Sequence, residues 1–230
     1  MSNLIHIKGT SRILGSYTLE PRPGLYRNIT TLRKTKGGWY NNVGLRNPGV
    51  SKFNKKAIIS LAGFSVNHFM SMLEIISGNP NVEGVEFNIS CPNADIVHIN
   101  SEVLNLANQL FDTVIIKVPH RLYLNSLIEI ADMGKCILHI SNSEKTYKGA
   151  LSGLSLVDVN LRSIYDLKAV RPDLKVIGGG GIYSVDILKE YQAAGADYFS
   201  LSTVLFNAYA TYKILKWSFK NQEASEDQEG

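Results

Sequence analysis

A chain of 230 residues with 44% hydrophobic residues fits one globular domain that can bury a large core without the help of disulfides or structural metal ions. Its net charge of +4 is too small to indicate nucleic-acid binding, and its apolar runs fall short of the ~18 residues of a membrane span. Two cysteines and five scattered histidines lack metal-type spacing, so no metal site is expected. The low cysteine content also predicts a reducing compartment, and therefore a cytoplasmic protein.

The first regular element is predicted at residue 57. Residues 10–56 are rich in glycine, proline, arginine and asparagine and predict long loops with at most short strands. The apolar run 57–61 is typical of a buried parallel strand. A helix with apolar residues at helical spacing follows Ser65, an expected N-cap, and ends at the Gly78-Asn79-Pro80 sequence.

The strand-then-helix pattern then repeats to the end of the chain. We expect strands at about 83–88, 114–117, 136–140, 175–177 and 198–201. We expect helices at about 101–111, 122–132, 155–169, 184–194 and 203–219. Six such units predict an α/β fold with a parallel sheet and helices outside it, either a closed barrel or an open sheet. The polar, acidic segment 221–230 is expected to be a disordered tail after one domain of residues 1–220.

Chemically capable residues gather where the predicted strands end. The sequence Asn88-Ile89-Ser90-Cys91-Pro92-Asn93 presents a thiol and two amides on a turn that its proline enforces, or else is an ordinary strand exit with an inert cysteine. The glycines at 178–181 and the Ser202-Thr203 pair follow two later strands and can admit a phosphate, or simply allow close packing. Lys117 ends an apolar strand and either meets an anion or extends to solvent. His139, within a strand, is expected to be a hydrogen-bonded core residue.

Taken together in chain order, these motifs resemble those of class 1 dihydroorotate dehydrogenases, which are flavin enzymes built on a (β/α)8 barrel. The resemblance extends from about residue 16 to residue 206, and the hexapeptide at 88–93 is its most specific part. The matching segments are residues 16–24, 41–49, 88–93, 117, 142–143, 151–153, 178–182 and 195–203.

The resemblance implies a (β/α)8 TIM barrel that oxidises dihydroorotate to orotate in pyrimidine biosynthesis, with FMN as cofactor. It implies that Cys91 is the general base and accepts the substrate proton while a hydride passes to the flavin. The residues implied to bind the substrate are Asn41, Val43, Gly44, Leu45, Asn88, Asn93, Asn142 and Ser143. The residues implied to bind FMN are Ser16, Asn88, Lys117, Ser141, Gly153, Gly180, Gly181, Ser202 and Thr203.

The chain departs from the family pattern mainly at its N-terminal end. Gly15 stands where the family has a lysine that touches both flavin and substrate. Too few residues precede Ser16 for the family's first strand–helix unit, so the barrel is expected to be incomplete at the N-terminus, unless residues 4–7 fill the gap. The loops after Asn93 and between Ser143 and Gly149 are also short.

Three functional interpretations therefore remain open. The first is an FMN-dependent dihydroorotate dehydrogenase, and the second is a non-catalytic derivative that binds a nucleotide-like ligand or a partner. The third is a flavin reductase that acts on another pyrimidine. Neither a nucleic acid nor a membrane is expected as a partner, whereas a homodimer and an electron-transfer partner subunit both stay open. The substrate loop 41–49 is more similar to the branch of the family that works with an iron–sulfur, NAD-linked subunit.

Overall fold

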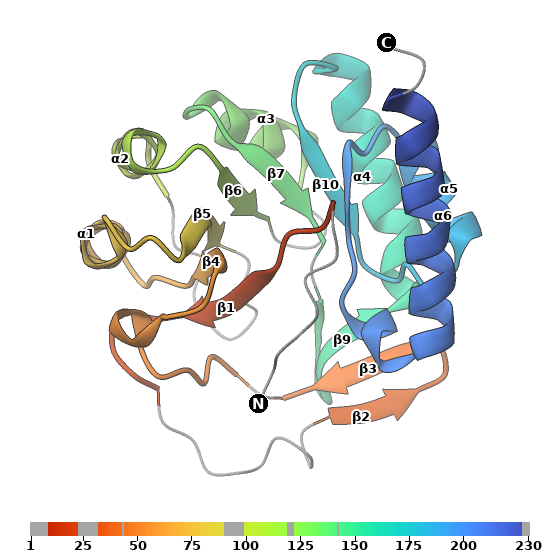
Figure 1. Ribbon diagram of the computed structural model, residues 1–230, viewed down its shortest axis with the longest axis horizontal. Helices are drawn as coiled ribbons and strands as arrows, with labels where there is room; N and C mark the ends of the chain where they lie inside the picture. The colour runs from red at the N-terminus through yellow and green to blue at the C-terminus, as the bar shows by residue number, and fades with distance from the viewer. Residues whose placement is uncertain are drawn as a thin grey trace.

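A curved parallel sheet dominates the computed structural model, which describes residues 9–22, 32–42, 44–89, 99–118, 122–141 and 143–226. All neighbouring strand pairs of this sheet run parallel. Figure 1 shows the helices arranged on its outer side. The strands, in spatial order, are β1 (Ile13–Tyr17), β4 (Ala57–Leu61), β5 (Val82–Asn88), β6 (Val114–Lys117), β7 (Ile137–Ile140), β10 (Val176–Gly179) and β11 (Tyr198–Ser200).

In this sheet, an α-helix separates each strand from β4 onward from the next one, and α6 follows β11, so the six expected strand–helix units are confirmed. The side chains of Ser65, Asn100 and Ser184 cap three of these helices by accepting a backbone N–H of the first turn. Short 3-10 helices, η1 (Val50–Lys52), η2 (Leu154–Leu156) and η3 (Thr203–Phe206), lie in the loops. The α-helices are α1 (Val66–Ile76), α2 (Ser101–Leu110), α3 (Leu124–Asp132), α4 (Val157–Val170), α5 (Val185–Ala193) and α6 (Ala208–Glu226).

The two faces of the sheet are buried in different ways. The outward-facing strand residues pack against the helices in one large core, which includes an edge-to-face contact between Phe69 of α1 and Phe87 of β5. A smaller cluster of Ile58, Ile115 and Ile177 contains strand residues alone and fills the concave side. Because side chains alternate across a strand, the next inward positions toward the carboxyl ends are Ser60, Lys117 and Gly179, and this level is polar.

The sheet is an incomplete TIM barrel, as the sequence comparison with the barrel family predicted. Within the described residues, β1 pairs with β4 alone and β11 pairs with β10 alone, so seven strands curl without closing. A complete barrel of this type has eight strands. Residues 4–7, which were considered for the missing strand, lie outside the described residues.

A second sheet, absent from the expected elements, lies beside the carboxyl ends of the parallel strands. It consists of β2 (Leu32–Thr35), β3 (Gly38–Asn41), β9 (Gly149–Gly153) and β8 (Glu144–Thr146), all antiparallel. Gly38 pairs with Gly153. A Cβ atom on Gly38 would lie 2.2 Å from the carbonyl oxygen of Ser152, and one on Gly153 would lie 2.2 Å from that of Gly37. The loop expected between Ser143 and Gly149 contains β8, which pairs with β9, and β9 in turn pairs with β3, more than 100 residues earlier in the chain.

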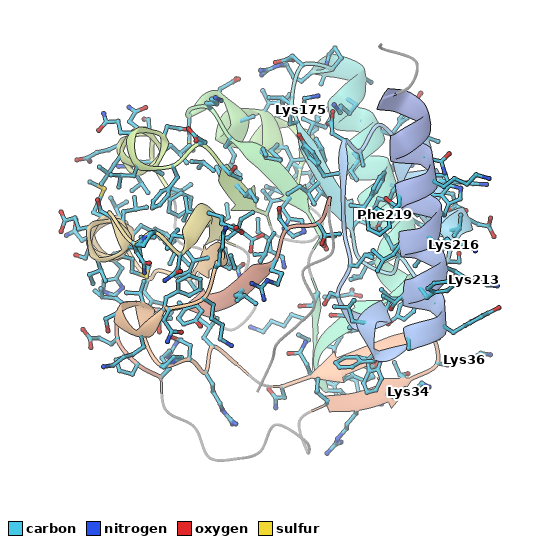
Figure 2. All side chains as sticks on the ribbon, viewed as in Figure 1. Lys34, Lys36, Lys175, Lys213, Lys216 and Phe219 are labelled. Carbon is cyan, nitrogen blue, oxygen red and sulfur yellow. The ribbon has the colours of Figure 1, made fainter. Side chains whose placement is uncertain are left out.

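Helix α6 covers the outside of the C-terminal part of the sheet. Its outer face carries Tyr209 and Tyr212, over whose rings lie the ammonium groups of Lys213 and Lys216. Figure 2 shows Lys213 and Lys216 projecting away from the helix. The helix ends at Glu226, inside the segment 221–230 that was expected to be disordered, and residues 227–230 lie outside the described residues. In the part of the chain that is described, no helix combines the length and apolarity needed to traverse a bilayer.

Candidate ligand site at the strand ends

The parallel register brings several predicted site residues to one edge of the sheet. Asn88 is the register partner of Lys117, and Lys117 is the register partner of His139. Just beyond β7, Ser141 accepts a hydrogen bond from Ser200 of β11, at an Oγ–Oγ distance of 3.4 Å. The ends of β5, β6, β7 and β11 therefore contribute polar groups to a common region, as the positions of the motifs predicted.

A continuous hydrogen-bond chain crosses the concave side of the sheet at this edge. Asn88 Nδ2 donates to Ser16 Oγ at 2.8 Å, and Ser16 Oγ lies 3.2 Å from Ser60 Oγ. Ser60 Oγ donates to Glu86 Oε1 at 2.7 Å, and His139 Nδ1 lies 2.6 Å from Glu86 Oε2. We call these five residues, Asn88, Ser16, Ser60, Glu86 and His139, the interior hydrogen-bond chain; it joins β1, β4, β5 and β7.

Glu86 is the charged centre of the interior hydrogen-bond chain. Burial alone would raise the pKa of this carboxyl group, because it is almost fully excluded from solvent. Hydrogen bonds from His139 and Ser60 and the positive charge of Lys117 outweigh burial and lower the pKa to about 2. The Glu86 side chain is therefore ionised at neutral pH and can only accept hydrogen bonds.

His139 was expected to be a hydrogen-bonded core residue, and the structure shows this for one of its two ring nitrogens. Burial lowers the pKa of His139, against the opposing effect of Glu86, and the charge of Lys117 lowers it further. The ring is therefore neutral at neutral pH, with its proton on Nδ1 toward Glu86. Its Nε2 atom is buried without a hydrogen-bond partner in the described structure.

The glycine turn after β10 contacts a second glycine-containing segment, at Gly153. Gly180 and Gly181 have φ angles of 88° and 79°. A Cβ atom on Gly181 would lie 2.6 Å from the carbonyl oxygen of Gly153, which itself has a φ of 144°. Only glycine fits at these positions, because both the backbone angle and the space exclude a side chain.

Side chains beneath the glycine turn hold it in place. Asn160 Nδ2 donates to the Gly179 carbonyl oxygen at 2.8 Å. The Tyr191 hydroxyl donates to the carbonyl oxygens of Gly179 and Gly180, at 2.7 and 2.8 Å. Both side chains come from helices on the outer side of the sheet, so the outer core fixes the shape of the turn.

The Ser202-Thr203 segment lies next to the glycine turn. The hydroxyl of Tyr183, two residues after Gly181, donates to Thr203 Oγ1 at 2.6 Å. In η3, Phe206 packs against Trp39 of β3, with 5.0 Å between ring centroids, which ties this segment to the second sheet. Three loops of the kind that binds phosphate, at 153, 180–181 and 202–203, are thus brought together.

The predicted substrate loop 41–49 is anchored by Asn47, a residue that sequence reasoning did not single out. Its Oδ1 atom accepts backbone N–H groups of Thr18 and Gly49, at 3.1 and 2.8 Å. Its Nδ2 atom donates to Thr18 Oγ1 and to the Leu45 carbonyl oxygen, both at 2.8 Å. The loop is thereby fastened to the end of β1, although Asn41, Gly44 and Leu45 make no hydrogen bond to the interior hydrogen-bond chain within the described residues.

Four predicted site residues, Val43, Cys91, Asn93 and Asn142, lie outside the described residues, so their roles remain predictions. Ser143 is described and lies directly before β8.

Comparison with known proteins identifies the family. No protein-family model matches the chain. The chain is 30% identical to the catalytic subunit of dihydroorotate dehydrogenase B (NAD(+)) from Bacillus cytotoxicus, over 85% of this chain and 74% of that protein. The chain belongs to the dihydroorotate dehydrogenase family. The corresponding subunit from Geobacillus sp. (strain WCH70) is 28% identical over 82% of this chain and 71% of that protein.

Solved structures of dihydroorotate dehydrogenases have the same fold. The crystal structure of the enzyme from Eimeria tenella in complex with ferulenol superposes with a TM-score of 0.67 at 14% identity, over 92% of this chain and 75% of that one. The ligand-free form of that enzyme gives the same TM-score, over 87% of this chain. The resemblance inferred from the motifs is thus confirmed at the level of family and fold.

The main departure from the dihydroorotate dehydrogenase pattern has a structural basis. Gly15 has a φ of 150°, and a Cβ atom there would lie 2.5 Å from the Ser60 carbonyl oxygen. No side chain can extend from this position without moving β1 or β4. A lysine at position 15, as the family pattern has, is incompatible with the way β1 packs on β4 in this chain.

Proposed function

We propose that this chain is an FMN-dependent enzyme that oxidises dihydroorotate to orotate. The observation that carries the proposal is the hydrogen bond of 2.8 Å between Asn88 and Ser16. It joins a residue predicted to bind the substrate to one predicted to bind the flavin, across 72 positions of the sequence. Membership in the dihydroorotate dehydrogenase family supports the same activity.

The described residues fit FMN in two respects. The cradle formed by Gly153, Gly180 and Gly181, with Ser202 and Thr203 beside it, suits a phosphate, because narrow glycine turns expose backbone N–H groups to an anion. Lys117 at the end of β6, with Ser16 of β1 and Ser141 just beyond β7, suits the flavin end of the cofactor. Bound FMN would supply the hydride acceptor, and the positive charge of Lys117 would favour an electron-rich ring.

The chain's own residues would bind the substrate and move one proton. We propose that the side chains of Asn41, Asn88, Asn93, Asn142 and Ser143, with backbone groups at Val43, Gly44 and Leu45, hold the pyrimidine carboxylate. Cys91 follows Asn88 by three residues, and its Sγ atom would accept the C5 proton while the hydride leaves C6. A thiol, with an ordinary pKa of about 8.5, becomes a competent base when its site favours the thiolate.

A second function is favoured by one observation, the absence of space for a side chain at Gly15. A site that lacks the family's lysine there could retain ligand binding without turnover, as a non-catalytic derivative of the fold. The names of the relatives also describe them as catalytic subunits of dihydroorotate dehydrogenase B (NAD(+)). That wording supports an electron-transfer partner subunit, whereas a homodimer and a cytoplasmic location rest on the sequence alone.

Flavin binding and flavin reduction separate the two functions. We expect the purified protein to bind FMN, and dihydroorotate to bleach the flavin absorbance without oxygen. Replacing the proposed base, in Cys91→Ala, should slow this reduction by about 100-fold or more. Cys136→Ala is the matched control, because burial raises the pKa of that thiol to about 11 and keeps it protonated. Failure to bind FMN would overturn the enzymatic function, and FMN binding without reduction would favour the non-catalytic one.

A further inference from the structure

The side-chain amide of Asn88 can adopt two orientations that differ by a half turn. One presents the carbonyl oxygen, an acceptor, and the other presents the amino group, a donor. Which orientation occurs decides what chemical group a ligand must offer at this position. The interior hydrogen-bond chain fixes the choice, because each of its hydroxyl groups has one proton to donate.

The direction of donation is set at Glu86. Both of its carboxylate oxygens accept, one from Ser60 Oγ at 2.7 Å and the other from His139 Nδ1 at 2.6 Å. The Ser60 proton is therefore committed to Glu86. In the contact of 3.2 Å between Ser60 and Ser16, Ser16 must then be the donor.

The direction of donation at Ser16 in turn fixes the orientation of Asn88. Since the Ser16 proton points to Ser60, the Ser16 oxygen can only accept from Asn88, and it does so from Nδ2 at 2.8 Å. The amino group of Asn88 thus faces Ser16, and the carbonyl oxygen faces away from it. The low pKa of Glu86 keeps the carboxylate ionised at neutral pH and so keeps the whole chain in this direction.

We propose that Glu86 and Ser60 are positioning residues that hold the Asn88 amide so that its carbonyl oxygen accepts a ring N–H of the ligand. This role rests on the proposed function for the identity of the ligand, a planar pyrimidine carboxylate with ring N–H groups. It assigns a purpose to a buried carboxylate that contacts neither substrate nor cofactor in the proposed mechanism. The same orientation of the Asn88 amide would disfavour an N-substituted ring, which has no proton to donate at that position.

Glu86→Gln is the sharpest variant, because it preserves size while allowing the direction to reverse. The new amide can still accept from His139 through its oxygen, and it can donate to Ser60 through its nitrogen. Ser60 would then be free to donate to Ser16, and Ser16 to the Asn88 carbonyl oxygen, which turns the amino group of Asn88 outward. Ser60→Ala removes the hydroxyl that links Glu86 to Ser16. It provides a second test in case Glu86→Gln does not fold.

The first measurement uses the ligand-free protein and is independent of the proposed function. In nuclear magnetic resonance spectra of 15N-labelled protein, the assigned side-chain amide signals of Asn88 should shift in Glu86→Gln and in Ser60→Ala. Glu83→Gln, at a partly exposed position of the same strand, is the matched control and should leave them in place. Unchanged Asn88 signals in both chain variants would overturn the positioning role.

The second measurement compares orotate with 1-methylorotate and 3-methylorotate on the FMN-loaded protein. In the wild type, at least one methylated analogue should bind about tenfold more weakly than orotate, since methylation removes one hydrogen bond. In Glu86→Gln and Ser60→Ala the difference in affinity between orotate and that analogue should fall to about threefold or less, because the hydrogen bond from the ring N–H to Asn88 is already lost. Ser163→Ala, a hydroxyl removal on α4 away from the site, should keep the wild-type ratio.

The two proposals fail in different ways. If the wild type binds orotate and the affinity ratio between orotate and the methylated analogue is unchanged in Glu86→Gln and Ser60→Ala, the positioning role is overturned. The proposed function is then left intact. A wild type that does not bind orotate, with Asn88 signals that shift as expected, overturns the proposed substrate and keeps the positioning role.

Discussion

His139 Nδ1 lies 2.6 Å from Glu86 Oε2, on the concave side of the sheet where both side chains are almost fully buried. The two residues belong to β7 and β5, so the contact passes over the intervening strand β6. A buried carboxylate needs donors on both oxygens to remain charged, and His139 supplies one of the two. The stability of the sheet is therefore coupled to the same atoms that order the ligand site.

Replacing His139 should be costly at neutral pH. His139→Leu removes a donor to a buried ionised carboxylate, and we expect a loss of about 2–4 kcal/mol in the free energy of unfolding, measured with urea. His68→Leu is the control, since the His68 ring accepts an exposed hydrogen bond of 3.3 Å from the Phe64 backbone N–H and contacts the Phe64 ring edge to face, but contacts no buried charge in the described structure. Equal effects of the two substitutions would contradict a special role for the buried pair.

The pH dependence of unfolding should report on His139. Its folded pKa is lowered from the ordinary 6.5 by burial first, opposed by Glu86 and assisted by Lys117. As the pH falls, the unfolded state therefore takes up a proton at His139 that the folded state resists. The contribution of neutral His139 to the free energy of unfolding is fully present above pH 6.5 and is lost as the pH falls below it. Urea unfolding between pH 7.5 and 5, with a limiting slope of about 1.4 kcal/mol per pH unit, should show the loss in the wild type.

The matching experiment repeats that series with His139→Leu. Most of the loss below pH 6.5 should disappear in this variant, and an unchanged pH profile would exclude His139 as its source. Glu86 acts in a separate window, because its pKa is lowered from 4.5 to about 2, and its contribution is lost only as the pH falls through that range.

Gly15 should tolerate no side chain. Gly15→Ala places a Cβ atom 2.5 Å from the Ser60 carbonyl oxygen, at a φ of 150°, and we expect a loss of about 3 kcal/mol or more. Gly78→Ala separates the two causes, because Gly78 also has a positive φ of 75° but has nothing within 4 Å of the new atom. Its expected cost is about 1 kcal/mol in the same urea measurement. Similar losses for both would show that the contact with Ser60 is relieved by movement of β1.

Tyr191 should control the affinity for FMN from outside the site. Tyr191→Phe removes the hydroxyl that bonds the Gly179 and Gly180 carbonyl oxygens, so the glycine turn loses support without losing any ligand contact. We expect FMN to bind about tenfold more weakly, measured by quenching of its fluorescence on titration. Tyr165→Phe, at an exposed position on α4, is the matched control. Unaltered affinity in Tyr191→Phe would mean that the turn does not hold the phosphate.

The parallel sheet could be predicted from β4 onward because its signals are local. The strand expected at 136–140 is observed at Ile137–Ile140, and the helix expected at 101–111 is observed at Ser101–Leu110. Each is defined by an apolar run or a helical period of a few residues. Strand β1 was missed as a regular element because it contains a glycine, follows a polar segment, and is held by its pairing with β4, some 40 residues later.

The candidate site was foreseen where residues form a motif and missed where they act through distant partners. The contact between Gly153 and Gly181 follows from loops that the sequence marks with glycine. Glu86 had one signal, a charged residue between the buried Val85 and Phe87. Its partner His139 is 53 residues away, and no spacing rule connects residues on strands that are not neighbours.

Among the described strands, β1 lies at one edge of the parallel sheet and β11 lies at the other. Within the described residues β1 has a neighbour on one side alone, whereas β4 and β5 each have two. Detachment of β1 by itself would withdraw Ser16 and sever Asn88 from Ser60, while the rest of the barrel stayed folded. The fraction of molecules that can bind ligand then equals the fraction in which β1 is paired with β4. Ligands that contact Ser16 would raise that fraction, because they bind only the paired state.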